Sequence, residues 1–338
     1  MKKEKKKPSS IRDFLTEFSL FPKLTIRKIA FIGILIAISV VIFIIFASFV
    51  PIISIPSYKI SFIGLPIKIS GFIFGPLVGG MVGLISDLIS FAMFPTFYNI
   101  YYTLAAVVDG VVSGFVGIIF MKVLKYAFGG EFKDATYESL IYKYRLKIEK
   151  IKLKDPDSPK ITKLENKIIA TNESRKKIKL LGTETSLLNV NMIVSTTVIA
   201  LACVFIFIIV YLKIDNNTIV NYSVIPNKLG LLLMMESGYI CMLIFLIVAR
   251  FKMKPKRYLV IVPIVIFSAL IELINVPLLS LADYSATNSS AAGGTIITYM
   301  FQHIMFTPVK IWFNMFIIFF THNVIAPLIN KNNDIMYN

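Results

Sequence analysis

Long apolar runs constrain the fold of this chain more than any other feature of its sequence. They cover about residues 29–50, 77–94, 100–123, 190–212, 229–249, 258–280 and 295–328, and a shorter apolar piece ends at residue 75. A helix of about 20 apolar residues spans the hydrocarbon core of a bilayer. Hydrophobic residues make up 56% of the chain and charged residues 16%, which is typical of a polytopic membrane protein. The sequence therefore predicts an all-α bundle of eight membrane-spanning helices.

The distribution of basic residues predicts the orientation of these helices. With a cytoplasmic N-terminus, the alternation of eight spans places residues 122–188 and 249–257 inside, and these segments are rich in Lys and Arg. The connections that fall outside are poor in both, as the positive-inside rule requires; they are residues 51–64, 95–100, 213–228 and 281–294. We expect both termini to be cytoplasmic and assign the net charge of +17 to orientation, not to nucleic-acid binding. The excess of Lys, Ile and Asn is typical of an AT-rich bacterial genome, so we expect a bacterial plasma membrane.

A lysine-rich segment interrupts the membrane-spanning part of the chain. Apolar residues recur in it at helical spacing, and the DPDSP sequence at 155–159 is a natural break, so the pattern predicts a solvated helical hairpin. The predicted organisation is a basic N-terminal segment (1–26), core helices one to four (27–126) with an outer loop at 51–64, a cytoplasmic insert (127–189), an added transmembrane hairpin (190–250), and core helices five and six with the C-terminal tail (251–338).

Small residues repeat at four-residue spacing in three places. Gly71, Gly75, Gly79 and Gly83 form one strip, Gly110, Gly114 and Gly117 form another, and Gly33 is followed by Ala37. Such strips allow membrane helices to approach closely. Gly75-Pro76 also predicts the end of one helix and the start of the next, because Pro suits a first helical turn.

Three acidic residues lie within apolar runs. Asp87, Asp109 and Glu272 fall roughly 7 to 9 residues from the predicted outer ends of their helices, or about 10 to 14 Å at 1.5 Å per residue. A carboxylate kept inside a membrane span usually faces a partner or a cavity. Lys68 and Lys310 are available as basic partners. Two interpretations stay open: ion pairs that brace the bundle, or a polar pocket that opens outward.

Ring-bearing and polar residues gather in the first two outer connections. They are Tyr58, Lys59, Phe62, Phe94, Phe97, Tyr98, Asn99, Tyr101 and Tyr102. An interfacial aromatic belt explains such residues singly, whereas the cluster as a whole suits a flat, ring-bearing ligand. Cys203 and Cys241 have no paired spacing, and His303 and His322 are too few for a metal cluster, so we expect neither a disulfide nor a bound metal.

An ordered series of motifs resembles the substrate-binding S component of energy-coupling factor (ECF) vitamin transporters. The series is IGILIAIS around Gly33 and Ala37, KISFIGLPI at 59–67, SGFIFGPLVGGMVGLISDLI at 70–89, FP at 94–95 and YTLAAVVDGVVSG at 102–114. It is most similar to the folate branch of the family. ALIELINVPLLSL at 269–281 and HIMFTPVKIWFNMFII at 303–318 are similar to the fifth and sixth helices of the family.

The resemblance implies a six-helix S-component core, here with two extra helices and an insert, that takes up a vitamin from outside. A transmembrane coupling subunit and two cytoplasmic ATPases would be its partners. Gly33 and Ala37 would contact the coupling subunit, and residues 54–64 would form a lid. Folate-type relatives carry an arginine where this chain has Ile44 and another at the start of the last helix, where this chain has Gln302 and His303. The resemblance implies that Gln302 and His303 contact the ligand, and the loss of the arginines weakens folate as that ligand. We expect no cofactor, and no Walker motif is found, so ATP would be hydrolysed by the partners.

The alternative functions are a stand-alone transporter, an S component for another vitamin, and a membrane enzyme. A stand-alone proton-coupled transporter would use Asp87, Asp109 or Glu272 as titrating groups, but the halves show no internal repeat of the kind that many such carriers have. An S component for riboflavin or pantothenate is a further alternative. A membrane enzyme is disfavoured, because neither a nucleophile-base pair nor an HExxH motif is present.

Overall fold

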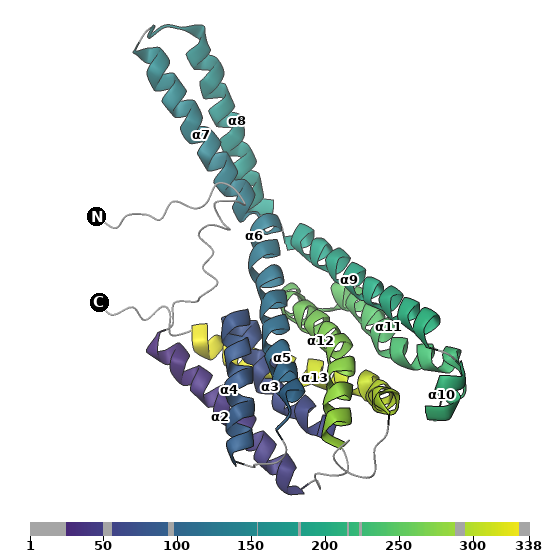
Figure 1. The fold of residues 1–338 in the computed structure, drawn as a ribbon. Coiled ribbons are helices and arrows are strands. Elements are labelled where there is room, and N and C mark those ends of the chain that lie inside the picture. The colour runs from purple at the N-terminus through teal and green to yellow at the C-terminus, as the bar shows by residue number, and fades with distance from the viewer. Residues whose placement is uncertain are drawn as a thin grey trace. The chain divides into compact units, whose positions relative to one another are not determined.

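The computed structural model describes residues 25–49, 56–93, 98–153, 155–181, 184–214, 216–222, 225–287 and 295–330 (Figure 1). All regular elements among these residues are helices, which confirms the all-α fold class. The chain divides into two compact units. The described part of the first, here called the membrane unit, comprises residues 25–119 and 192–330, and that of the second, the insert unit, comprises residues 120–191.

The helices of the membrane unit match most of the predicted spans. They are α2 (Ile26–Phe49), α3 (Pro56–Phe74), α4 (Pro76–Met93), α5 (Ile100–Ile118), α9 (Glu184–Lys213, from residue 192 onward), α10 (Asn216–Tyr222), α11 (Lys228–Lys252), α12 (Pro255–Thr287) and α13 (Ile296–Asn330). Within the described residues, seven helices are long and apolar enough to cross a membrane. The eighth predicted span is present only as a shorter apolar stretch, Gly64–Phe74 in α3. The chain is thus a polytopic helical membrane protein.

The prediction of an outer loop at residues 51–64 is wrong from residue 56 onward. Helix α3 begins at Pro56, and residues 51–55 lie outside the described part of the chain. Pro56 occupies the first helical turn, where the missing N–H costs nothing. Apolar residues alternate in this segment, which favours an extended chain locally, but packing within the bundle overrides such a local preference. A lid formed by 54–64 would therefore be largely helical.

Glycine contacts hold α3, α4 and α5 close together, as the small-residue strips predicted. A Cβ atom built on Gly110 would lie 2.1 Å from the carbonyl oxygen of Gly79, and one on Gly71 would lie 2.1 Å from that of Gly110. Gly75 has a φ of 103°, a left-handed conformation that favours glycine, and it separates α3 from α4. The three helices therefore meet backbone to backbone at these glycines.

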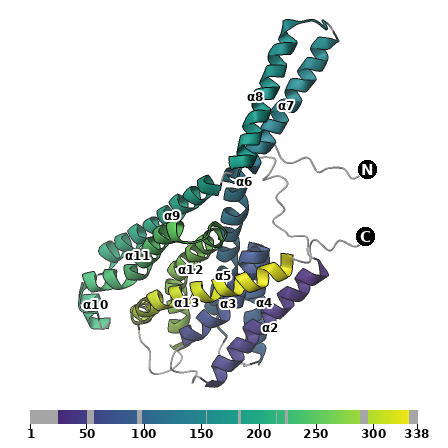
Figure 2. The same cartoon turned by 180° about the vertical axis from the view of Figure 1, so that it is seen from behind.

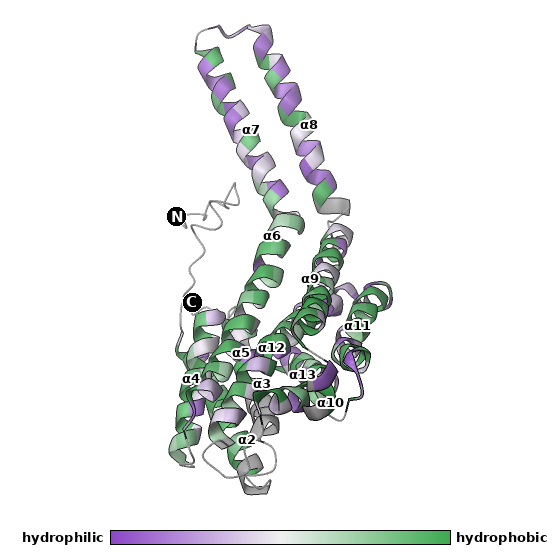
Figure 3. Cartoon of the chain, turned by 45° about the vertical axis from the view of Figure 1, so that its right-hand side comes forward, coloured by the Kyte–Doolittle hydropathy of each residue, from purple (hydrophilic) through white to green (hydrophobic). Residues whose placement is uncertain are grey.

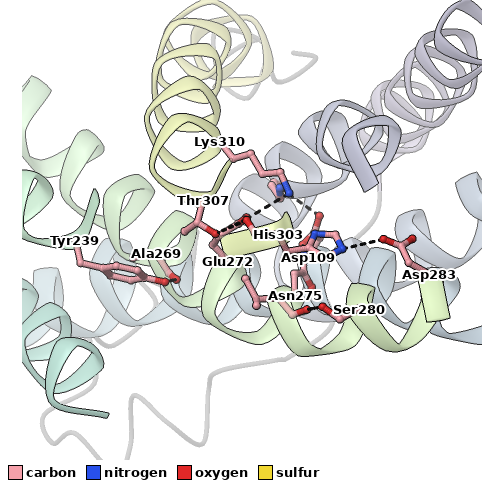
Figure 4. Close-up of polar contacts among 12 residues, drawn as sticks. Asp109, Tyr239, Ala269, Glu272, Asn275, Ser280, Asp283, His303, Thr307 and Lys310 are labelled. Atoms are coloured by element: carbon pink, nitrogen blue, oxygen red, sulfur yellow. Dashed lines mark hydrogen bonds and ion pairs between the residues drawn. The ribbon is translucent and has the colours of Figure 1, made fainter. Parts of the chain in front are cut away.

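The remaining helices of the membrane unit pack around this core. Helix α12 packs on α5 and α13, and α13 also packs on α3 and α11. The added helices α9 and α11 lie side by side in both views of the chain (Figures 1 and 2). On α11, Gly238 approaches α13, where a Cβ would lie 3.1 Å from Cα of Pro308. The hairpin of α9 and α11 is thus attached to the bundle through α13, and also through α12, where the Tyr239 hydroxyl donates to the carbonyl oxygen of Ala269 at 3.1 Å (Figure 4).

The insert unit is an antiparallel helical hairpin. A π-helix, η1 (Ile119–Leu124), and the short α6 (Lys125–Phe128) lead to α7 (Glu131–Lys152), which packs along α8 (Pro159–Leu181). The break between α7 and α8 includes the predicted DPDSP segment. Polar residues cover both helices, in contrast to the apolar spans (Figure 3). Arg175 of α8 joins them, with Nε 2.5 Å from Asp134 Oδ1 and Nη2 2.8 Å from Glu138 Oε2.

Candidate substrate-binding site

A buried ion pair connects α3 and α5. Lys68 Nζ lies 3.3 Å from Asp109 Oδ2, and the two side chains are 2% and 1% exposed. Asn275 of α12 donates a hydrogen bond from Nδ2 to Asp109 Oδ1 at 2.8 Å. A Cβ on Gly64 would lie 2.4 Å from Asp109 Oδ2, so this glycine makes room for the carboxylate. Three helices are thereby connected through one acidic residue.

A second buried pair connects α12 and α13 (Figure 4). Glu272 Oε1 lies 3.7 Å from Lys310 Nζ and accepts a hydrogen bond from Thr307 Oγ1 at 3.3 Å. Asp109 and Glu272 lie within electrostatic range of each other. We call these six residues, Lys68, Asp109, Asn275, Glu272, Thr307 and Lys310, the inner layer. Lys68 and Lys310 are the partners that the sequence predicted, and this geometry favours the bracing interpretation for both acids.

A third polar group joins α5, α12 and α13. His303 Nε2 lies 2.9 Å from Asp283 Oδ2, and the hydroxyl of Tyr102 donates to Asp283 Oδ1. His303 and Asp283 are buried, whereas Tyr102 is half-buried. One carboxylate thus holds two residues from two other helices, and both were predicted to contact a ligand.

Asn99 adds to the same group from the start of α5. Its Nδ2 donates to the carbonyl oxygen of Ala282 at 2.8 Å and to Ser285 Oγ at 2.6 Å, and its Oδ1 caps the helix by accepting from the amide of Tyr101. We call Asn99, Tyr102, Asp283 and His303 the outer layer, after the prediction from the charge rule that the N-terminal end of α5 faces outside.

Asp283 is the member of the outer layer that the sequence analysis missed. Residues 281–294 were predicted to form an outer loop, so Asp283 was not included among the acids of the membrane spans. Helix α12 instead continues to Thr287 and buries Asp283. The LADYSAT sequence, with polar residues between apolar ones, gave no stop signal such as Gly or Pro, and this was the available clue.

The third predicted acid, Asp87, belongs to a separate contact. Thr103 Oγ1 donates to Asp87 Oδ2 at 2.6 Å and lies 3.1 Å from the hydroxyl of Tyr98. The ring of Tyr98 packs edge-on against Phe91, with ring centroids 5.2 Å apart. Asp87 is half-buried and Tyr98 is exposed. The three acids therefore do not meet at one point: Asp109 and Glu272 lie in the inner layer, and Asp87 lies beside Tyr98.

The other predicted ligand residues differ in burial, and the structure does not describe all of their side chains. Tyr101 is half-buried on α5, and Gln302 is exposed on α13. Tyr58, Lys59 and Phe62 fall in the first turns of α3, where the structure describes the backbone but not the side chains. Phe94 lies outside the described residues. The structure thus brings Tyr102, His303 and Asn99 together, and separately Asp87 and Tyr98.

Comparison with known protein families identifies the first third of the chain. Residues 23–136 match the family model of the ECF-type riboflavin transporter, S component. This part of the chain is similar to an ECF-type S component. The match is to the riboflavin family, so it does not support the predicted similarity to the folate branch. No curated protein and no solved structure matches the chain.

An S component is a transport subunit without catalytic activity of its own, which agrees with the expectation that this chain is not an enzyme. Among the described residues, no group of three His, Cys, Asp or Glu side chains is arranged to hold a metal ion.

The small-residue face of α2 is open in this structure. Gly33 and Ala37 are exposed, and a Cβ built on Gly33 would meet no atom within 4 Å. This is the opposite of Gly79 and Gly110, which are packed against backbone. The α2 face is thus not used for packing within the described chain.

Proposed function

We propose that this chain binds riboflavin, or a vitamin with a similar fused ring, from outside the cell and carries it across the membrane as the substrate-specific subunit of an ECF importer. A separate coupling subunit and two cytoplasmic ATPases would supply the energy. The observation that carries the proposal is the match of residues 23–136 to the riboflavin S-component family.

The charges of the membrane unit support riboflavin over folate. Folate carries a glutamate tail whose carboxylates need cations, and fork-shaped arginine pairing is the strong way to hold them. Lys68 and Lys310, the lysines buried in the described part of the bundle, are already engaged by Asp109 and Glu272. Riboflavin has no carboxylate, so it needs no additional cation.

The outer layer and its neighbours have the chemistry that a flavin requires. Riboflavin combines a flat, largely apolar ring system with polar ring edges and a chain of hydroxyl groups. Aromatic side chains bind such rings by stacking, while a few well-placed polar groups fix the orientation. The half-buried or exposed tyrosines at 98, 101 and 102 could supply ring faces, and the Tyr102 hydroxyl and His303 could supply hydrogen bonds, with Asn99 holding the start of α5 in place. We therefore place the ligand at the outer end of α5 and α13.

The open face of α2 supports the coupling part of the proposal. A small-residue face that no neighbouring helix covers allows another membrane helix to approach closely. Gly33 and Ala37 form such a face. We propose that it contacts the coupling subunit, with Gly33 at the point of closest approach.

Purification of the chain tests the proposed substrate directly. The ligand extracted from purified protein should have the mass and absorbance of a flavin, and ligand-free protein should quench the fluorescence of added riboflavin with saturation. Folate and pantothenate serve as competitors, and neither should displace riboflavin. Extraction of a folate, or the absence of riboflavin binding with retained folate binding, would contradict the proposal.

A transport assay separates the importer from a stand-alone carrier. Vesicles that contain this chain alone should take up no riboflavin when a proton gradient is applied. Addition of the coupling subunit, the ATPases and ATP should restore uptake. Proton-driven uptake by the chain alone would contradict the importer and favour the secondary transporter.

A further inference from the structure

The insert unit carries a charge distribution that binding and transport of a vitamin do not require. Helices α7 and α8 lie antiparallel, with a buried seam that includes Ile141, Ile148 and Ile161. Arg175 closes one end of this seam through Asp134 and Glu138. These bonds raise the pKa of Arg175, chiefly through the hydrogen bond to Asp134.

Lysines gather on one side of this hairpin. Successive side chains of an α-helix are about 100° apart, so residues three, four and seven apart share a face. Lys143, Lys147 and Lys150 follow this spacing on α7, and Lys160, Lys163 and Lys167 follow it on α8; all six are exposed. Both sets lie on the same flank relative to the buried seam of their helix. Because the helices are antiparallel, these flanks form one continuous surface, which we call the lysine face.

The two sides of the hairpin differ in charge. At helical spacing, the lysine face continues on α7 with Thr136 and Ser139 and on α8 with Ala170 and Ser174. Of the carboxylates in the described parts of the two helices, only Glu173, three residues after Ala170, borders this face. The opposite side mixes both signs: Glu138, Arg145, Glu149 and Lys152 on α7, and Glu165 and Lys176 on α8. A hairpin that needed charge only for solubility would not require this separation.

The composition of the lysine face indicates the kind of partner. Protein interfaces depend on Trp, Tyr and Arg anchors, and single-stranded nucleic acids require aromatic stacking platforms; among the described residues, the face has neither. Lysine alone is a point charge that attracts anions without fixing their geometry. A surface of anionic phospholipid headgroups is bound by such point charges alone.

The insert unit is connected directly to a candidate membrane span, which keeps it near the lipid headgroups. The hairpin follows directly on the candidate span Ile100–Phe128, so it is tethered to the bilayer and its local concentration near the headgroups is high. Gly130 has a φ of 90° at the start of α7, so α7 does not continue the axis of α6. We propose that the lysine face binds anionic phospholipid headgroups on the side of the membrane where the hairpin emerges. This proposal does not depend on which vitamin the chain binds.

Vesicles of defined composition test this proposal with the full-length chain. Cys203 and Cys241 are replaced by Ala, and a fluorophore is attached through Ala170→Cys on the lysine face or Ile169→Cys, which points to the other side. The chain is reconstituted in phosphatidylcholine alone or with phosphatidylglycerol, and both contain a quencher on the lipid headgroup. We expect the label at 170 to be quenched more strongly when phosphatidylglycerol is present, and the label at 169 to change little. Salt at about 1 M should abolish the difference, because the Debye length is then about 3 Å.

Two triple variants with equal charge change provide the control. Lys147, Lys150 and Lys163 are replaced by Gln on the lysine face, or Arg145, Lys152 and Lys176 are replaced by Gln on the opposite side; Gln retains helix propensity. Each lysine near an anionic surface favours binding by roughly fivefold, so the first variant should weaken it about a hundredfold. The second should bind nearly as the parent does. Equal quenching in the two lipid compositions, or an equal loss in both variants, would overturn the proposal. The single variant Lys147→Gln gives the same test with less risk to folding.

Discussion

The inner and outer layers of the membrane unit use the same kinds of residues in different ways. In the inner layer, Asp109 and Glu272 are each paired with a lysine, and all four side chains are buried. In the outer layer, Asp283 and its partner His303 are buried as well, but its other partner, Tyr102, is half-buried, and the neighbouring Tyr98 is 41% exposed. An ion pair enclosed on all sides can only brace helices, whereas a polar group with open neighbours can also meet a ligand. The comparison teaches that burial of the partners, more than the presence of an acid in a span, separates bracing from binding.

Breaking the inner layer should give the largest effect on stability. Lys68→Ala leaves the buried Asp109 carboxylate without its cation, and loss of one partner of a buried ion pair costs about 3–5 kcal/mol. We expect a markedly lower unfolding temperature for the purified protein in detergent. The double variant Lys68→Met with Asp109→Asn removes both charges, so it should recover most of the loss. If Lys68→Ala unfolds at the parental temperature, the inner layer is not a brace.

Removal of the acid of the outer layer should act mainly on the ligand. Asp283→Ala frees the side chains of Tyr102 and His303, and hydrogen bonds to a charged group contribute about 1.5–3 kcal/mol each. We expect riboflavin affinity to fall by roughly tenfold or more, because its contacts are no longer held in place. Isothermal titration measures this change. Asp283→Asn retains one acceptor oxygen, so its riboflavin affinity should lie between those of the parent and of Asp283→Ala. Equal affinity in all three proteins would show that Asp283 does not contribute to the site.

A smaller effect is expected from the ring of Tyr98. Stacking of an aromatic pair is worth about 0.5–1.5 kcal/mol beyond area burial, so Tyr98→Ala should weaken riboflavin binding by several-fold. Tyr98→Phe keeps the ring and loses only the hydroxyl near Thr103, and it should bind almost normally. Fluorescence titration of the two variants distinguishes the ring from the hydroxyl. Weaker binding by Tyr98→Phe than by Tyr98→Ala would contradict a stacking role.

Replacement of the small residues on α2 should leave both layers unchanged. Gly33→Trp with Ala37→Trp adds bulk to an open face, so we expect riboflavin affinity and unfolding temperature close to those of the parent. Uptake by vesicles with the complete importer should nevertheless be lost, because the coupling subunit can no longer approach. Loss of riboflavin binding in this variant would count against the proposed docking role. Gly79→Trp is a contrasting control, since it would clash with Gly110 and should prevent folding.

The sequence predicted the parts of this structure that depend on regular patterns. Apolar length located the seven helices that could cross a membrane, and glycine spacing located the contact of α3, α4 and α5. The pairing of buried acids with Lys68 and Lys310 followed from the high free energy of an unpaired charge in lipid. The first two predictions depend on a property that many residues share, and the third depends on a large free-energy cost.

The parts that the sequence did not predict depend on alternative local conformations that differ little in free energy. Residues 56–64 alternate like a strand but form the start of α3, and α12 runs beyond residue 280 to Thr287. The second error placed Asp283 in a loop and hid the outer layer. The folate branch was inferred from motifs of the core, which position helices and not the ligand; the family match instead favours riboflavin. Substrate choice depends on a few side chains that such motifs do not specify.

Riboflavin titration of two variants tests the central claim most directly. One is Asp283→Asn in the outer layer, and the other is Lys68→Met with Asp109→Asn in the inner layer. If the outer layer positions the ligand and the inner layer braces the helices, the dissociation constant should rise several-fold or more in the first variant and stay near the parental value in the second. A parental dissociation constant for Asp283→Asn together with lost binding in the inner-layer variant would contradict the account.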